Sequence, residues 1–151
     1  MKKKSIPYFL ALIFWRIFKP KTFGARALLI KNDQVLLVRH TYQSLWYLPG
    51  GGVKSGETYG EALQRELKEE IDVTVCRFEL FGLYNSTFEV KNDSIAIFLC
   101  TEFELGNQVD RIEIAEMRFF KLKDLPADIS PGTYRRIQEY INNAYPNFGR
   151  W

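Results

Sequence analysis

The sequence is poor in the features that mark disulfide-rich or low-complexity proteins. Its two cysteines, Cys76 and Cys100, lie in separate apolar stretches without the spacing of a disulfide framework or a metal site. It has no internal repeat and no long Gly/Ser, Gln/Asn or acidic tract. These absences exclude a disulfide scaffold and a disordered chain, and they predict a protein of a reducing compartment with both thiols in its core.

No apolar run in the sequence reaches the roughly 20 residues that span a bilayer. The longest, residues 6–15, follows three lysines as a secretory signal would, but the basic residues Arg16 and Lys19 come soon after it. We therefore predict that residues 1–21 form a helical extension, and that residues 1–19 dock on the domain or contact a membrane surface. The expected location is the cytoplasm, with membrane association left open.

Length and charge limit the organisation of the chain and its partners. With 151 residues it can form one ordinary domain, which we assign to residues 22–151. The net charge of +3 comes largely from residues 2–21 rather than from the domain. We therefore expect no nucleic-acid partner, while a homodimer stays open.

Short apolar runs alternate with amphipathic segments along the domain. The runs predict a hairpin of strands at residues 25–30 and 35–40, longer strands at 73–84 and 94–104 joined through 90–93, and a strand at 117–122. Helical spacing predicts helices at residues 59–71 and 133–144, the first with Thr58 or Ser55 as its N-cap. This irregular alternation favours an α/β (α+β) fold in which helices cover a mixed sheet.

One face of the first predicted helix carries three glutamates. Glu66, Glu69 and Glu70 are spaced i, i+3 and i+4, which places them side by side. Because like charges repel, a cation should neutralise them: either Lys and Arg side chains or a divalent metal ion. Oxygen ligands without a nearby His or Cys indicate Mg²⁺ or Mn²⁺. The simpler alternative is a solvated charged face.

The loop before this helix favours the metal over the solvated face. Gly50, Gly51 and Gly52 let the backbone approach a ligand closely. Their carbonyl and amide groups can join the carboxylates around a metal-bound pyrophosphate.

Residues 51–73 resemble the Nudix box. The matching positions are Gly51, then Glu57 after five residues, then Arg65-Glu66-Leu67-Lys68-Glu69-Glu70 after seven more, and the apolar Val73. Asp72 stands where the family usually has a glycine that ends the helix in a left-handed conformation, which Asp tolerates better than most residues. Residues 46–51 and 118–126 look like the family's flanks, so the resemblance covers residues 22–126.

The resemblance implies a Nudix-type α/β/α sandwich, with a mixed sheet between helices. It also implies cleavage of a nucleoside diphosphate linked to another group, such as a nucleoside triphosphate, a nucleotide sugar or ADP-ribose. The implied reaction is attack of metal-activated water on phosphorus, with Mg²⁺ as cofactor and Mn²⁺ as a substitute. The implied metal ligands are Glu66, Glu69, Glu70 and the Gly51 carbonyl; the catalytic residues are Glu69, Glu66, Arg65 and Glu57; the substrate-binding residues are Gly50, Gly51, Gly52 and Arg39.

Within the catalytic set we predict Glu69 as the general base, with Glu66 second. Glu57 is expected to pair with Arg65, whose fork would fix the other carboxylates toward the metal. The alternative for Arg65 is an ordinary ion pair on the helix surface with Glu61 or Glu69. The alternative for Glu57 is a first-turn position, where the helix dipole favours a negative charge.

Several further side chains could reach a substrate, although structural roles are more usual for each. These are His40, the aromatic residues Tyr42, Trp46, Tyr47 and Tyr84, and the acidic residues Glu113 and Glu116. The last predicted helix, with Arg135, Arg136 and Glu139, reads as a packed cap with a solvated outer face.

Two functions of different class follow from this reading: an active pyrophosphohydrolase, and a non-catalytic nucleotide-sensing module on the same fold. The intact Arg65 and the three glutamates favour the enzyme, because a binding module does not need a clustered acidic face. A third hypothesis, that the basic N-terminus directs the protein to a membrane or to RNA 5′ ends, is compatible with activity.

Overall fold

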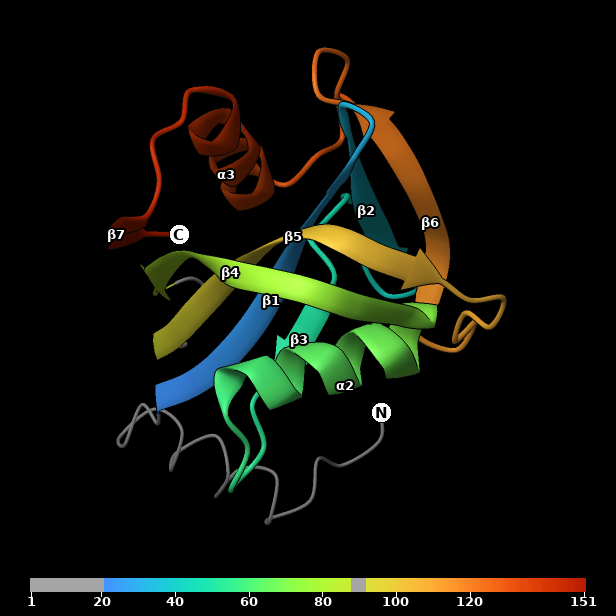
Figure 1. Ribbon diagram of the computed structural model, residues 1–151, viewed down its shortest axis with the longest axis horizontal. Helices are drawn as coiled ribbons and strands as arrows, with labels where there is room; N and C mark the ends of the chain where they lie inside the picture. The colour runs from blue at the N-terminus through green and yellow to red at the C-terminus, as the bar shows by residue number, and fades with distance from the viewer. Residues whose placement is uncertain (1–20, 88–91) are drawn as a thin grey trace, which may run out of the picture.

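The computed structural model describes residues 21–87 and 92–151, and Figure 1 shows their arrangement. The elements in chain order are β1 (Lys21–Lys31), β2 (Gln34–His40), β3 (Gly50–Gly52), α2 (Tyr59–Ile71), β4 (Val73–Ser86), β5 (Asn92–Leu105), β6 (Ile114–Lys121), α3 (Pro131–Ile141) and β7 (Asn147–Arg150). The predicted N-terminal helix lies outside the described residues, and β1 begins at Lys21, one residue before the expected start of the domain.

The strands form one mixed, seven-stranded sheet. Its order is β6-β2-β1-β5-β4-β7, and β3 pairs with β1 outside this path. The pairs β1–β5 and β4–β7 are parallel, whereas β1–β2, β1–β3, β2–β6 and β4–β5 are antiparallel. The predicted mixed sheet is confirmed.

Side chains of β1 alternate between two cores, as the period of a strand requires. Ala25, Ala27 and Leu29 pack in the cluster that holds the apolar side of α2. Leu28 and Ile30 point to the other face, where their cluster includes Ile137 of α3. Figure 1 shows the two helices on opposite sides of the strands. The sheet is therefore covered on both faces, which confirms the α/β/α sandwich.

Local signals at both ends of α2 explain why it spans residues 59–71 as predicted. Thr58 is its N-cap: the Thr58 side chain accepts from the Glu61 N–H, and the Glu61 carboxylate accepts from the Thr58 N–H in return. Asp72 ends the helix in the left-handed region, at φ 52° and ψ 42°. Asp thus adopts the conformation for which the family usually has glycine.

The Asp72 side chain also organises the segment that follows β5. One carboxylate oxygen accepts from the backbone N–H groups of Asn107 and Gln108 at 2.9 and 3.2 Å, and the other binds Lys68. These contacts hold the pKa of Asp72 below its usual value, with Lys68 as the largest cause. A Cβ on Gly106 would overlap this carboxylate, so Asp72 and Gly106 form a matched pair.

Several predicted boundaries differ from the structure. α3 begins at Pro131 after the N-cap Ser130 and ends at Ile141, earlier than the predicted 133–144. Asn92 and Asp93, predicted to lie in a connection, belong to β5 instead, because they pair with β1 and β4. The strands β3 and β7 were not predicted, since each is short and is held by partners far away in the sequence.

The two cysteines do not share an environment. Cys100 is buried in β5, where burial raises the pKa of its thiol to about 12. Cys76 is exposed, so the prediction of two core thiols is wrong for this residue. Its place in β4 explains the difference, because Val75, its neighbour along the strand, is the residue that points into the core.

Candidate active site

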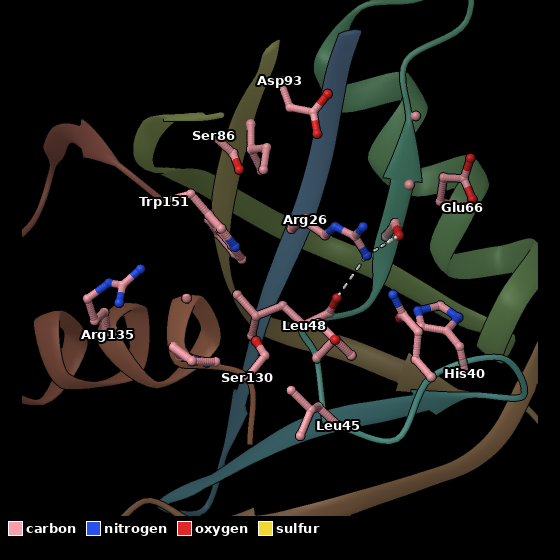
Figure 2. Close-up of a pocket in the computed structure, with 18 of the residues that line it drawn as sticks. Arg26, His40, Leu45, Leu48, Glu66, Ser86, Asp93, Ser130, Arg135 and Trp151 are labelled. Carbon is pink, nitrogen blue, oxygen red and sulfur yellow. Dashed lines mark hydrogen bonds between the residues drawn. The ribbon is translucent and has the colours of Figure 1, made fainter. Parts of the chain in front are cut away.

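A cleft of about 1220 Å³ lies between α2 and α3 (Figure 2). Ligand pockets are usually roughly 300–1,000 Å³, so this one can hold a molecule with two bulky parts. We call one side the glutamate end, which contains Glu66, Glu70 and Glu113, and the other the tryptophan end, which contains Gly132, Arg135 and Trp151. Gly50, Gly51 and Gly52 line the cleft beside the glutamates.

The glycine loop lies close to neighbouring parts of the fold, and at Gly50 the backbone requires glycine. Gly50 has φ +123°, and a Cβ there would overlap the carbonyl oxygen of Ala25. Gly51 lies against Glu66, since a Cβ on Gly51 would be 2.5 Å from the Glu66 carboxylate carbon. The absence of side chains thus brings the loop backbone next to the helix carboxylates.

Arg26 holds this loop through hydrogen bonds to its backbone, a role that was not predicted from the sequence. It lies in β1 and donates from one guanidinium nitrogen to the carbonyl oxygens of Leu48 and Gly50, at 3.2 and 2.7 Å (Figure 2). The available signal was a charged residue between Ala25 and Ala27, both fully buried. Arg26 is therefore a positioning residue for the glycine loop.

The Arg65 guanidinium joins the loop to the acidic side chains. Arg65 binds both carboxylate oxygens of Glu57, at 2.5 and 2.9 Å, and also Glu66 at 2.7 Å, Glu69 at 3.2 Å and the Gly52 carbonyl oxygen at 3.0 Å. The predicted Glu57–Arg65 pair is present, and the helix-surface partner Glu69 is bound in addition. These bonds lower the pKa of Glu57 to about 2 and raise the pKa of Arg65, so both groups are charged at neutral pH.

Glu70 is buried, with 6% of its surface exposed. Its carboxylate accepts from the Gly50 N–H at 3.4 Å. Burial raises the pKa of Glu70 to about 7; the charges of Glu66 and Glu113 add to this effect, and Arg26 opposes it. Glu70 has no salt bridge with any described residue, so its charge would be stabilised by a cation in the cleft.

The three glutamates do not converge on one point in this structure. Glu66 lines the cleft, but its carboxylate binds Arg65. The Glu69 side chain is 59% exposed and is not among the cleft-lining residues. Within residues 21–87 and 92–151, no group of three or more His, Cys, Asp or Glu side chains lies close enough to hold a metal ion.

The cleft nevertheless fits a hard divalent cation. Glu66, Glu70 and Gly51 offer oxygen atoms at the glutamate end, and oxygen is the ligand type that Mg²⁺ and Mn²⁺ prefer. Burial of the Glu70 carboxylate without an ion pair gives a bound cation an energetic role. Glu69 could join them after a rotation of its exposed side chain.

His40 also faces the glutamate end. It lines the cleft with 5% of its surface exposed, and its buried Nδ1 has no hydrogen-bond partner among the described residues. Burial lowers the pKa of His40, the charge of Arg26 lowers it further, and the Glu113 backbone opposes the shift. The Tyr42 ring stacks on the imidazole, with centroids 5.2 Å apart.

The other predicted substrate contacts divide into two groups. Tyr42, Tyr47 and Glu113 line the cleft, whereas Trp46 and Tyr84 are buried in the core beneath α3. The latter two therefore have structural positions.

Arg39, predicted to bind substrate, does not line the cleft. Its guanidinium binds Glu116 at 3.2 Å and Asp128 at 2.5 Å and lies over the Trp46 ring, 4.6 Å from its centroid. Because Arg39 and Glu116 are engaged in these contacts, the structure does not support a role in the site for either residue.

The tryptophan end was not predicted. Arg135 lines the cleft, and Arg136, expected on a solvated face, is instead 3% exposed. Trp151 reaches the cleft only because β7 pairs with β4, a contact without a local sequence signal.

The fold and the cleft define an α/β/α protein with an acidic helix at its ligand site, and its relatives give the family. A model of the NUDIX domain matches residues 20–140, so the chain belongs to the Nudix family. A MutT NUDIX hydrolase from Burkholderia pseudomallei has the same fold, with a TM-score of 0.73 and 22% identity over 79% of this chain and 97% of that one.

Two curated relatives are named hydrolases. Nudix hydrolase 5 of Arabidopsis thaliana is 25% identical over 153 residues, which cover 92% of this chain and 47% of the plant protein. Diphosphoinositol polyphosphate phosphohydrolase 3-alpha of Homo sapiens is 30% identical over 116 residues, 72% of this chain and 71% of the human protein. The chain thus spans about half the length of its plant relative.

Proposed function

We propose that this protein is a Mg²⁺-dependent pyrophosphohydrolase that cleaves a nucleoside diphosphate linked to another group. The observation that carries the proposal is the buried Glu70 carboxylate, which shares a cleft with Glu66 and the backbone of Gly51. Membership of the Nudix family supports hydrolysis of a diphosphate bond, and the names of its relatives agree with it.

The residues that would hold Mg²⁺ are Glu66, Glu69, Glu70 and the Gly51 carbonyl, with Mn²⁺ as a substitute. When bound, the ion would neutralise diphosphate charge and make a water molecule more acidic for attack on phosphorus. Arg65 orients Glu57 and Glu66 through its hydrogen bonds. Gly52 has open space where a Cβ would lie, which leaves room for the diphosphate against the loop.

For the proton acceptor, we retain both Glu69 and Glu66. Glu66 lines the cleft, with 16% of its side chain exposed, while Glu69 lies outside it and binds Arg65 at 3.2 Å. The position of Glu66 in the cleft therefore supports it as the proton acceptor more strongly than the sequence did, which favoured Glu69. Both residues belong in the test.

Hydrolysis of a substrate panel with Mg²⁺ tests the proposal. The panel contains nucleoside triphosphates, nucleotide sugars, ADP-ribose and, because of the human relative's name, a diphosphoinositol polyphosphate. We expect turnover of a nucleoside diphosphate derivative, and a loss of roughly 10²-fold or more in kcat in Glu66→Gln or Glu69→Gln, whichever accepts the proton. Glu70→Gln should raise the Mg²⁺ concentration needed.

A matched control is Glu104→Gln, since Glu104 is exposed on β5 and lies outside the cleft. Turnover that is unchanged in all three glutamate variants would refute the site. Nucleotide binding without turnover of any substrate would favour the non-catalytic sensing module instead.

The location and assembly of the protein stay predictions. The part of the chain that the structure describes contains no helix that is long and apolar enough to cross a membrane. Contact of residues 1–19 with a membrane surface, a cytoplasmic location and a homodimer follow from the sequence reading alone.

A further inference from the structure

Trp151 is the main aromatic surface at the end of the cleft opposite the glutamates. Its backbone N–H donates to the Asn85 carbonyl oxygen at 2.9 Å, next to the residues where β7 pairs with β4. Figure 2 shows its indole extending from the backbone into the cleft. The side chain is only partly buried, so some of the ring remains available to a ligand.

Contacts with three residues hold the indole in place. A Cβ on Gly132 would overlap its Nε1 atom, so the first turn of α3 lies directly against the ring. The Tyr84 ring meets it edge-on at 6.3 Å, and the Arg136 guanidinium lies 5.7 Å from its centroid. A ring that is already held loses little conformational entropy when a second ring stacks on it.

Arg136 is itself fixed beneath this surface. Its guanidinium binds Glu139 at 2.7 Å, donates to the Arg150 carbonyl oxygen at 3.2 Å and lies 3.9 Å from the Tyr84 ring centroid. Arg136 is 3% exposed, so its charge interacts with groups inside the fold and does not face the cleft. The network supports Trp151 without competing for the ligand.

Arg135 lies beside this platform. It follows Gly132 by three residues on α3, which places both on one side of the helix, and it lines the cleft. It is exposed and makes no ion pair with a described residue. Its donors suit the carbonyl oxygens and ring nitrogens of a heteroaromatic base.

We propose that Trp151 determines substrate specificity by stacking on the nucleobase, with Arg135 contacting the edge of the base. This inference rests on the proposed function, because the glutamate end then holds the diphosphate and the nucleoside extends across the cleft. The competing aromatic surface is Tyr42, which is stacked on His40 at the glutamate end. The volume of about 1220 Å³ leaves room for both parts of such a substrate.

Equilibrium binding of nucleoside 5′-monophosphates to the full chain tests the inference, with ribose 5-phosphate as the probe without a base. Stacking on an aromatic side chain accounts for roughly 10-fold to 100-fold in affinity. We therefore expect Trp151→Leu to weaken nucleoside monophosphate binding by about that factor and to leave ribose 5-phosphate binding unchanged. Trp151→Phe, which keeps a ring, should show a smaller loss.

Further variants guard against a folding artefact. Gly132→Ala retains the indole but displaces it, so it should also weaken base-dependent binding. Tyr42→Leu removes the competing aromatic surface and should weaken base-dependent binding less than Trp151→Leu does. Tyr134→Leu is the matched control, because this α3 ring is exposed and lies outside the cleft, and it should bind nucleoside monophosphates as the wild type does. In a Trp15→Phe background, nucleotide quenching of tryptophan fluorescence should be lost when Trp151→Phe is added, because the one remaining tryptophan, Trp46, is buried and does not line the cleft.

Three results would overturn the inference. These are unchanged nucleoside monophosphate binding in both Trp151→Leu and Gly132→Ala, equal weakening for the probe without a base, or a base-dependent loss in Tyr42→Leu alone. The hydrolase proposal is judged separately, by turnover in the glutamate variants. Either proposal can therefore fail while the other stands.

Discussion

Carboxylates of the site differ because their surroundings differ. Glu57 accepts two hydrogen bonds from Arg65, and its pKa falls to about 2. Glu70 is buried without an ion pair to a described residue, and its pKa rises to about 7. Arg65 therefore balances the charge of Glu57, whereas an ionised Glu70 would be stabilised by a bound cation.

The buried His40 predicts a measurable pH dependence of stability. Its pKa in the folded protein lies below the usual 6.5, so below about pH 6.5 the unfolded chain binds more protons and stability falls. The raised pKa of Glu70 acts in the opposite direction, because the folded protein then binds a proton first as the pH falls through about 7.

A comparison of wild type with His40→Gln separates these two effects, since His40 is the only histidine. In metal-free buffer, lowering the pH from ~7.5 to ~5.5 should reduce the melting temperature more, or increase it less, in the wild type than in the variant. Parallel curves of melting temperature against pH would show that His40 is not buried in its neutral form.

The resemblance to the Nudix box predicted part of this chemistry. It implied the Glu57–Arg65 pair, and the structure contains this pair. The different burial of Glu66, Glu69 and Glu70 could not be predicted, because all three share one helix face in the sequence pattern. It depends on the glycine loop that packs on that face and on Arg26, which comes from β1.

At the scale of elements, α2 carries the site, and both of its ends are set locally. The reciprocal hydrogen bonds of Thr58 and Glu61 cap the start of the helix, and Asp72 ends it in the left-handed conformation. Such signals lie within a few residues of one another, which is why the sequence predicted residues 59–71. The strands β3 and β7 lack such signals, since Gly50 pairs with Arg26, and Phe148 pairs with Leu83.

The pair of Asp72 and Gly106 allows a double-mutant test of the helix end. Gly106→Ala should lower the melting temperature of the wild type, because the new Cβ would overlap the Asp72 carboxylate. In the Asp72→Gly background the same change should have little effect, since the carboxylate is gone. Additive effects of the two substitutions would contradict the contact.

At the scale of the whole molecule, the sheet brings distant parts of the chain to one cleft. The glutamate end comes from β3, α2 and the residue before β6, and the tryptophan end comes from α3 and the residue after β7. Periodicity alone indicated a mixed sheet covered by helices, whereas the resemblance to the Nudix box selected the sandwich. The C-terminal half of the cleft was not predicted because it depends on tertiary pairing of β7 with β4.

In the proposed active state, the helix carboxylates share a divalent cation with the glycine loop. Anomalous diffraction from crystals grown with Mn²⁺ and a non-hydrolysable nucleoside diphosphate derivative tests it directly. We predict a manganese peak bound by Glu66, Glu70 and the Gly51 carbonyl, with Glu69 turned toward it, and a weaker peak in Glu70→Gln. Wild-type crystals with the nucleotide bound, but with no peak and with Glu66 still on Arg65, would contradict the account.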